Sequence, residues 1–258
     1  MNMLDAYASI AEFYDLEHDS LVEDVAFYRQ YVETAGDPVL ELACGTGRVA
    51  VPIAADGYRV VGADRSEPML AGARRRADEA GVELTLLNAE MVDARSMPGG
   101  PFGVVILALG ALSHIETADG QLEALTSARQ ALDPRGVLLI DIMHATPSRL
   151  QTLDGSYGFD GSWRSADGSA VHRFSSSSVH PATQTIESHI WYDRTSVTGG
   201  ITRHATSMTQ RYLTPGELLL MLEVAGFEEV ALYGGYELDP FADDSERLIV
   251  AAEATRTR

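Results

Sequence analysis

A glycine-rich turn that follows an apolar run near residue 40 is the strongest chemical signal in the chain. The run Val39–Cys44 leads directly into Gly45-Thr46-Gly47. Glycines at such a point let a ligand approach the backbone closely and permit unusual backbone dihedral angles. By itself the turn fits either a simple tight turn or, completed by Ala50, a dinucleotide-binding fingerprint. The neighbouring strands must therefore decide what it binds.

Acidic residues stand at the ends of the next two predicted strands. Asp64 ends the second strand, at the usual distance after the turn for a carboxylate that binds ribose hydroxyls. Glu90 follows the third strand. Ligands of open α/β sheets bind at the carboxyl ends of the strands. Gly45, Gly47, Asp64 and Glu90 are therefore expected along one ligand-binding edge.

The first half of the chain alternates short apolar runs with segments whose apolar spacing suits helices. This alternation predicts a doubly wound α/β core with a parallel sheet that helices cover on both faces. The predicted strands are Val39–Ala43, Arg59–Asp64, Leu84–Ala89, Gly103–Leu109 and Gly136–Met143. The predicted helices are Arg48–Ala55, Glu67–Ala80 and Asp119–Ala131.

The second half changes character. Residues 148–168 are rich in Gly, Ser and Asp and predict a loop or lid. From Val171 to Leu213 the pattern predicts antiparallel strands with a turn at Gly199-Gly200, packed over one end of the sheet. A capped helix from Thr214 and a last strand complete the core. The expected organisation is a helical lid (1–37), a core (38–147), an acceptor-binding insertion (148–213) and a C-terminal completion (214–258).

Composition narrows the partners. The 258 residues carry a net charge of -19 and a sequence pI near 4.6, which repels nucleic acid and anionic membranes. The basic run Arg74-Arg75-Arg76 is expected to form a solvated helix face. A single cysteine, Cys44, precludes an intrachain disulfide, and residues 1–8 do not resemble a signal peptide. We expect a cytoplasmic protein, monomeric or homodimeric, that binds neither nucleic acid nor membrane.

The sequence motifs taken together resemble those of the class I S-adenosylmethionine (SAM)-dependent methyltransferases. Glu41–Gly47 resembles the first motif of that family, Val60–Leu70 the second and Leu86–Met91 the third. Phe102–Leu109 is similar to the fourth and Leu132–Ile140 to the segment after it. The third motif has Glu90, and the fourth Gly103, where the family more commonly has Asp.

The resemblance extends over nearly the whole chain. Leu213–Leu218, Ala225–Phe227 and Arg247–Ala252 are similar to the last helix and closing hairpin of the family, which nicotinamide dehydrogenases generally lack. It implies a Rossmann-like, seven-stranded, mostly parallel sheet whose last strand is antiparallel. It also implies SAM as the cofactor, a small-molecule methyl acceptor and no metal.

The resemblance also implies cofactor contacts. Glu41 and Gly45 would lie near the amino acid end of SAM, and Asp64 would bind its ribose. The alternative for Glu41 is a charge partner of a helix N-terminus, and Met69 is also compatible with a core residue that touches adenine. Arg48 is expected to be solvated or ion-paired. The implied cofactor-binding residues are Glu41, Ala43, Gly45, Gly47, Asp64, Arg65, Met69, Glu90, Met91 and Leu107.

His114 and Tyr14 are the candidate catalytic residues. His114 lies in the loop after the fourth strand, where a histidine could accept a proton near neutral pH, or else cap a backbone carbonyl. Tyr14 lies in an N-terminal segment similar to one that folds over SAM in small-molecule enzymes. For Tyr7 and Tyr14 the alternative is packing on one helix face at i, i+7. A similar Tyr and His occur in amine and amino-sugar N-methyltransferases, which favours an amine acceptor.

The insertion is expected to supply acceptor specificity. Trp191 and Tyr192 point to opposite faces of a strand, so only one can line the pocket. The candidates are Arg173, His189, Trp191, Tyr192, Arg203 and Arg211.

We therefore predict a methyltransferase acting on an amine nitrogen or a hydroxyl oxygen of a small molecule. Three alternatives are a SAM-binding protein without activity, an NAD-dependent oxidoreductase and an aminopropyl transferase. The closing segment disfavours the oxidoreductase. The lack of acidic residues in Leu107–Ser113 disfavours the aminopropyl transferase.

Overall fold

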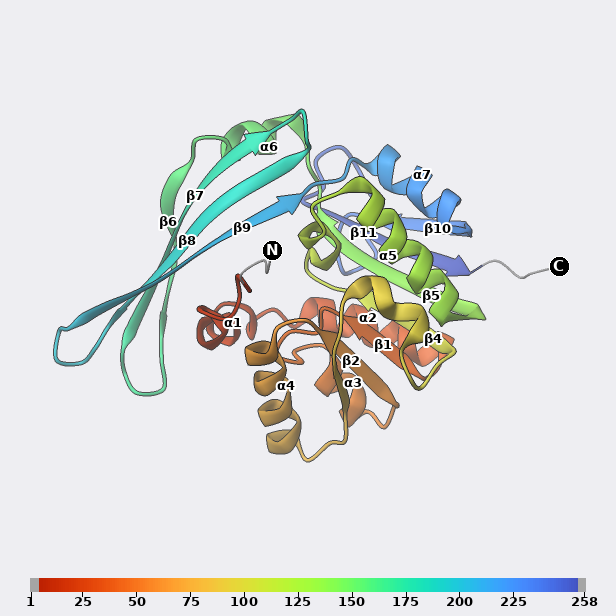
Figure 1. The fold of residues 1–258 in the computed structure, drawn as a ribbon, viewed down its shortest axis with the longest axis horizontal. Coiled ribbons are helices and arrows are strands. Elements are labelled where there is room, and N and C mark those ends of the chain that lie inside the picture. The colour runs from red at the N-terminus through yellow and green to blue at the C-terminus, as the bar shows by residue number, and fades with distance from the viewer. Residues whose placement is uncertain (1–4, 255–258) are drawn as a thin grey trace.

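The computed structural model describes residues 5–254. Residues 1–4 of the predicted helical lid and residues 255–258 of the predicted C-terminal segment lie outside that range. It contains a seven-stranded sheet of order β10-β11-β5-β4-β1-β2-β3 and a four-stranded sheet of order β6-β7-β8-β9. Figure 1 shows the smaller sheet projecting from the core, with helix α1 (Ala11–His18) between the two. The predicted fold class is confirmed.

The large sheet is buried on both faces because successive residues of its strands alternate between two hydrophobic layers. One layer packs against α5 (Ala118–Ala131) and α7 (Pro215–Ala225), and the other against α2 (Glu23–Ala35) and α3 (Ala50–Ala55). Three strands, β1 (Val39–Leu42), β2 (Val60–Asp64) and β4 (Phe102–Leu107), are buried along their whole length. The remaining parallel strands are β3 (Thr85–Asn88) and β5 (Leu132–Met143), and α4 (Glu67–Ala80) connects β2 to β3.

Two short 3-10 helices follow strands of this sheet. The first, η1 (Met91–Ser96), comes after β3, and the second, η2 (Ala111–His114), comes after β4. They carry two of the predicted site residues, Met91 and His114, at the carboxyl edge of the sheet.

The closing segment behaves as its sequence predicts. Thr214 caps α7 by accepting a hydrogen bond from the Glu217 backbone N–H, and Gly226 ends the helix in a left-handed conformation. Strand β11 (Arg247–Ala254) then runs antiparallel to both of its neighbours, β5 and β10 (Phe227–Tyr233).

The small sheet consists of β6 (Tyr157–Arg164), β7 (Ala170–His180), β8 (Thr185–Thr195) and β9 (Ile201–Arg211). All of its pairs are antiparallel. A long hairpin joins β8 to β9 across the predicted turn at Gly199-Gly200.

The prediction of a loop over residues 148–168 is wrong. Helix α6 (Pro147–Leu153) begins there at the capping residue Thr146, and β6 follows it. Gly158 and Gly161 lower the strand propensity of this stretch. Pairing with β7 nevertheless satisfies its backbone groups, with an irregular register between Phe159 and Gly161.

Over residues 5–254, no helix has the length and apolar character needed to cross a membrane.

Candidate active site

A cavity lies at the carboxyl ends of the parallel strands, where the sequence predicts a ligand. Its wall combines the loops after β1, β2, β3 and β4 with the N-terminal segment. Nine predicted site residues line it: Tyr14, Ala43, Gly45, Asp64, Arg65, Met69, Glu90, Met91 and His114. Three others, Glu41, Gly47 and Leu107, do not.

Asp64 organises the turns on both sides of this cavity. One carboxylate oxygen accepts a hydrogen bond from the Gly45 backbone N–H at 2.8 Å, and the other accepts one from the Ser66 N–H at 2.8 Å. Burial raises the pKa of Asp64, and these two hydrogen bonds oppose the shift. Each oxygen keeps a second lone-pair direction for a ligand hydroxyl.

The two glycines of the turn, Gly45 and Gly47, have different structural roles. Gly45 adopts a positive φ of 54° on the cavity wall, where a side chain would be strained. A Cβ at Gly47 would lie 3.1 Å from Val51 Cγ2 and 3.3 Å from Ala73 Cβ. Gly47 therefore allows α3 and α4 to approach each other, and it does not form the cavity wall.

Glu41 is a buried acid near the end of β1 and does not line the cavity. Its Oε2 has no hydrogen-bond partner within the described residues, and burial raises the pKa of its carboxyl to about 8. An unpartnered buried carboxyl oxygen is costly unless a ligand uses it.

Leu107 is fully buried in the core layer against α5, so its side chain is not on the cavity. Ala108 and Leu109, the next two residues, line the cavity instead. The presence of Gly103, where the family more commonly has Asp, also has a steric reason. A Cβ there would lie 2.5 Å from the Gly36 carbonyl oxygen, so the end of α2 excludes an Asp.

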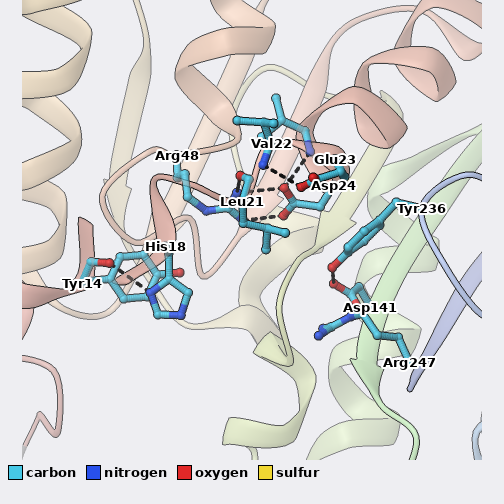
Figure 2. Close-up of polar contacts among 11 residues, drawn as sticks. Tyr14, His18, Leu21, Val22, Glu23, Asp24, Arg48, Asp141, Tyr236 and Arg247 are labelled. Atoms are coloured by element: carbon cyan, nitrogen blue, oxygen red, sulfur yellow. Dashed lines mark hydrogen bonds and ion pairs between the residues drawn. The ribbon is translucent and has the colours of Figure 1, made fainter. Parts of the chain in front are cut away.

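The N-terminal segment closes the cavity with two tyrosines. Tyr7 lies in a turn before α1, so the alternative of one shared helix face with Tyr14 is wrong. Both rings line the cavity, edge to face, with centroids 6.2 Å apart. His18 stacks on the Tyr14 ring at 4.3 Å, and its Nδ1 lies 3.0 Å from the Tyr14 carbonyl oxygen (Figure 2).

Arg48 is buried and ion-paired, which confirms one of its two expected states and excludes the solvated one. Figure 2 shows its guanidinium on the carboxylate of Asp24, which is itself fully buried. The same guanidinium donates to the Leu21 carbonyl at 2.9 Å. Arg48 thus ties the chain between α1 and α2 to the cofactor turn.

His114 is held by two neighbours. Its Nε2 lies 3.1 Å from the Tyr7 hydroxyl and 3.4 Å from the Gln210 amide nitrogen. Burial raises the pKa of Tyr7 far above its usual range, so the hydroxyl keeps its proton. It donates to Nε2 when the imidazole proton is on Nδ1 and accepts from Nε2 in the other tautomer. Burial, followed by the charge of Arg65, lowers the pKa of His114 to about 4. The ring is therefore neutral at pH 7.

A second cavity, of about 390 Å³, lies between α1 and the small sheet. This is within the range of roughly 300–1,000 Å³ that is typical of small-molecule pockets. Four residues line both cavities: Tyr7, Tyr14, Leu109 and His114. The two cavities therefore meet at the candidate catalytic residues.

The second cavity holds a charged cluster. Arg173 lies 2.9 Å from an Asp160 oxygen and 3.5 Å from a Glu17 oxygen. The Tyr192 hydroxyl donates to the same Glu17 oxygen at 2.6 Å. The other polar lining residues include Ser175, Ser177, Ser188 and Gln210. Two carboxylates against one guanidinium leave this cluster one negative charge in excess.

The structure separates the six predicted acceptor residues. Only Arg173 and Tyr192 line the second cavity. Trp191 points to the opposite face, where it stacks on Phe174 and lies under Arg203. His189 bonds Ser207 on the exposed surface, and Arg211 is buried against Gln121 and Glu217.

Sequence reasoning missed Tyr7, Glu17 and Asp160 as lining residues of these cavities. The i, i+3 spacing of Tyr14 and Glu17 was the available signal for Glu17, since it places both on one face of a helix. No local signal marked Asp160, because its strand was predicted as a loop.

The residues of the first cavity fit SAM. Asp64 offers a carboxylate to ribose hydroxyls, and Glu90 and Met91 lie where an adenine ring is expected. Glu41 does not line the cavity, but it lies two residues before the cavity-lining Ala43, and its unpartnered oxygen would suit the cationic amino acid end. Within residues 5–254, no cluster of three or more His, Cys, Asp or Glu side chains has metal-binding geometry.

Comparisons with known proteins agree with this geometry. A family model for a methyltransferase domain matches residues 39–136. The demethylmenaquinone methyltransferase of Thermus thermophilus is 37% identical over 142 residues, 52% of this chain and 62% of that protein. The glycine/sarcosine N-methyltransferase of Parasynechococcus marenigrum is 26% identical over 218 residues, 83% of this chain and 71% of that protein.

A solved structure is similar over almost the full length. The CcbJ methyltransferase from Streptomyces caelestis is 28% identical, with a TM-score of 0.78 that covers 97% of this chain and 98% of that one. The alignments with three curated relatives span only 41%, 62% and 47% of their lengths. The chain thus spans about half the length of those relatives.

Proposed function

We propose that the chain is a class I SAM-dependent methyltransferase and that it methylates an amine nitrogen of a small molecule. The observation that carries this proposal is the meeting of two cavities at Tyr7, Tyr14, Leu109 and His114. One cavity has the groups that SAM requires, and the other has the size and polarity of a small-molecule site.

SAM supplies a methyl group on a positively charged sulfur, which a nucleophile displaces in line. The main task of the protein is therefore to hold the acceptor lone pair in line with the methyl group. His114 and Tyr14 lie where the two ligands would meet. Nε2 of the neutral His114 could accept a hydrogen bond from an acceptor N–H that takes the place of the Tyr7 hydroxyl, and so aim the lone pair.

The junction also selects the reactive form of an amine. Burial and Arg65 disfavour a positive charge on His114, as its lowered pKa shows. The same surroundings disfavour an ammonium ion at that point. These surroundings therefore favour the neutral form of an amine at the junction, which has the free lone pair that methyl transfer needs.

The second cavity supports an amine acceptor with polar substituents. Its excess negative charge attracts a cationic molecule on approach, and its serine and glutamine side chains offer hydrogen bonds. The similarity to a glycine/sarcosine N-methyltransferase points in the same direction. A hydroxyl acceptor would need a strong base, and the lowered pKa of His114 makes it a weak one.

The test combines binding and turnover. Calorimetric titration of the purified protein should give binding of SAM and S-adenosylhomocysteine and none of NADH. A screen of small hydroxylated amines against matched alcohols, with mass spectrometry of the products, should then give methylation of amines only.

Each part of this test can contradict the proposal. Methylation of alcohols alone would overturn the amine assignment. Binding of SAM without turnover on any acceptor would favour a non-catalytic SAM-binding protein. Binding of NADH without SAM would overturn the function as a whole.

A further inference from the structure

The Arg74–Arg76 run does not form a uniformly solvated face, because Arg76 turns inward to the N-terminal segment. Its guanidinium lies 2.8 Å from an Asp15 oxygen and 2.7 Å from an Asp19 oxygen. Its Nε donates to the Thr46 carbonyl at 3.2 Å. A single side chain of α4 thus contacts both α1 and the glycine turn.

We propose that Arg76 is a positioning residue that latches α1 onto the cofactor turn and slows the release of SAM. The inference rests on the proposed function in one respect only, which is that SAM occupies the first cavity. The contact between the latch and α1 is independent of any ligand.

The latch is closed by a second link between the same elements. The Thr46 hydroxyl donates to Asp15 Oδ1 at 2.5 Å, the oxygen that Arg76 also contacts. Asp15 therefore accepts one hydrogen bond from the turn and one ion pair from α4. Movement of α1 away from the core must break both.

The turn side of the latch is rigid. Thr46 is 2% exposed, and a Cβ added at Gly72 would lie only 2.9 Å from its Cγ2 methyl. Close packing on α4 therefore fixes Thr46 between the two glycines of the turn. Asp15 is therefore bonded to a part of the cofactor site that is closely packed and cannot shift easily.

The α1 side of the latch carries the residues that close the cavity. Tyr14, which precedes Asp15, lines both cavities. The far side of α1 packs on the small sheet, where Phe13 stacks on Tyr192 at 4.6 Å. If the latch opens, Tyr14 moves away from the methyl-transfer point and this wall of the cofactor cavity loosens.

The expected effect is moderate. Arg76 is 26% exposed and Asp19 is 49% exposed, so solvent screens part of the attraction. An ion pair supported by a hydrogen-bonded threonine is worth more than an isolated surface pair. For Arg76→Gln we expect the SAM dissociation rate to rise about tenfold.

Two measurements test the latch, with Arg74→Gln as the matched control. Arg74 is on the same helix, but it forms an ion pair with the exposed Glu67 of that helix. Hydrogen exchange of the α1 amides, measured without cofactor, should be faster in Arg76→Gln than in the control and the wild type. Stopped-flow dissociation of SAM should show the same order. Asp19→Asn, which keeps Arg76 and Asp15, should give a smaller shift in both.

The outcomes separate the two proposals. Equal exchange and equal SAM release in the two arginine variants would overturn the latch, as would faster exchange with unchanged SAM release. If Arg76→Gln does not fold, the same comparison between Asp19→Asn and the wild type decides. Absence of SAM binding by the wild type would overturn the proposed function, and the exchange data would still report on the contact with α1.

Discussion

The two cavities that meet at His114 are built in different ways. The first is framed by the ends of buried parallel strands, and backbone groups such as the Gly45 and Ser66 N–H hold its key carboxylate. The second is framed by a helix and by half-exposed strands of an antiparallel sheet. Its polar surface consists of side chains, among them Glu17, Asp160 and Arg173.

This difference assigns separate tasks to the two halves. A site organised by the backbone of a packed core suits a ligand that does not change, here the cofactor. A site made of side chains on a sheet can change its specificity without disturbing the core. Substitutions in one cavity should therefore affect one ligand and spare the other.

The largest effect is expected for Asp64→Ala. The substitution removes the carboxylate and leaves the Gly45 and Ser66 N–H groups without their partner, so SAM affinity should fall about a hundredfold. Calorimetry measures this directly. Unchanged SAM affinity would remove Asp64 from the cofactor site and break the contrast between the cavities.

An intermediate effect is expected for Arg173→Gln in the second cavity. Loss of the guanidinium leaves Glu17 and Asp160 without their shared cation, so the KM for the amine identified in the screen should change about tenfold with SAM affinity kept. The matched control is Arg203→Gln, because Arg203 pairs with Asp193 away from the cavity. Equal effects of the two variants on KM would place acceptor recognition elsewhere.

The smallest effect concerns the pH dependence of SAM binding. With a pKa of about 8, Glu41 holds its proton at neutral pH, whereas a cationic ligand favours the ionised form. SAM binding therefore lowers the pKa of Glu41 and releases part of this proton, which becomes easier as the pH rises. A fall of this pKa by about one in the complex would raise SAM affinity about fivefold between roughly pH 6.5 and 8.5. In Glu41→Gln this part of the dependence should vanish, and the same slope in both proteins would exclude Glu41 as its source.

The sequence was most informative where local chemistry and position coincide. The positive φ of Gly45, the carboxylate at the end of β2 and the capped helix at Thr214 are each encoded within a few residues. These features predicted the large sheet and most of the first cavity wall. The backbone groups of Leu107 and Ala108 were predicted to close the cofactor site, and the structure places Ala108 on the cavity wall.

The second cavity was harder to predict because long-range pairing creates it. Strand β6 has two glycines and a weak pattern, and only its partner β7 makes it a strand. Asp160 and Arg173 come together across that pair, and Glu17 meets Tyr192 over 175 residues of chain. The inward orientation of the Arg76 side chain likewise depends on its contacts with Asp15 and Asp19, which the composition of α4 does not reveal.

The most direct test of the account is the kinetics of His114→Ala on the amine identified in the screen. The central claim is that methyl transfer occurs where the two cavities meet. The account predicts that kcat falls about a hundredfold. SAM affinity should stay within about twofold of the wild type, since the imidazole aims the acceptor without anchoring the cofactor. An unchanged kcat would contradict the claim and leave His114 as a structural residue of its loop.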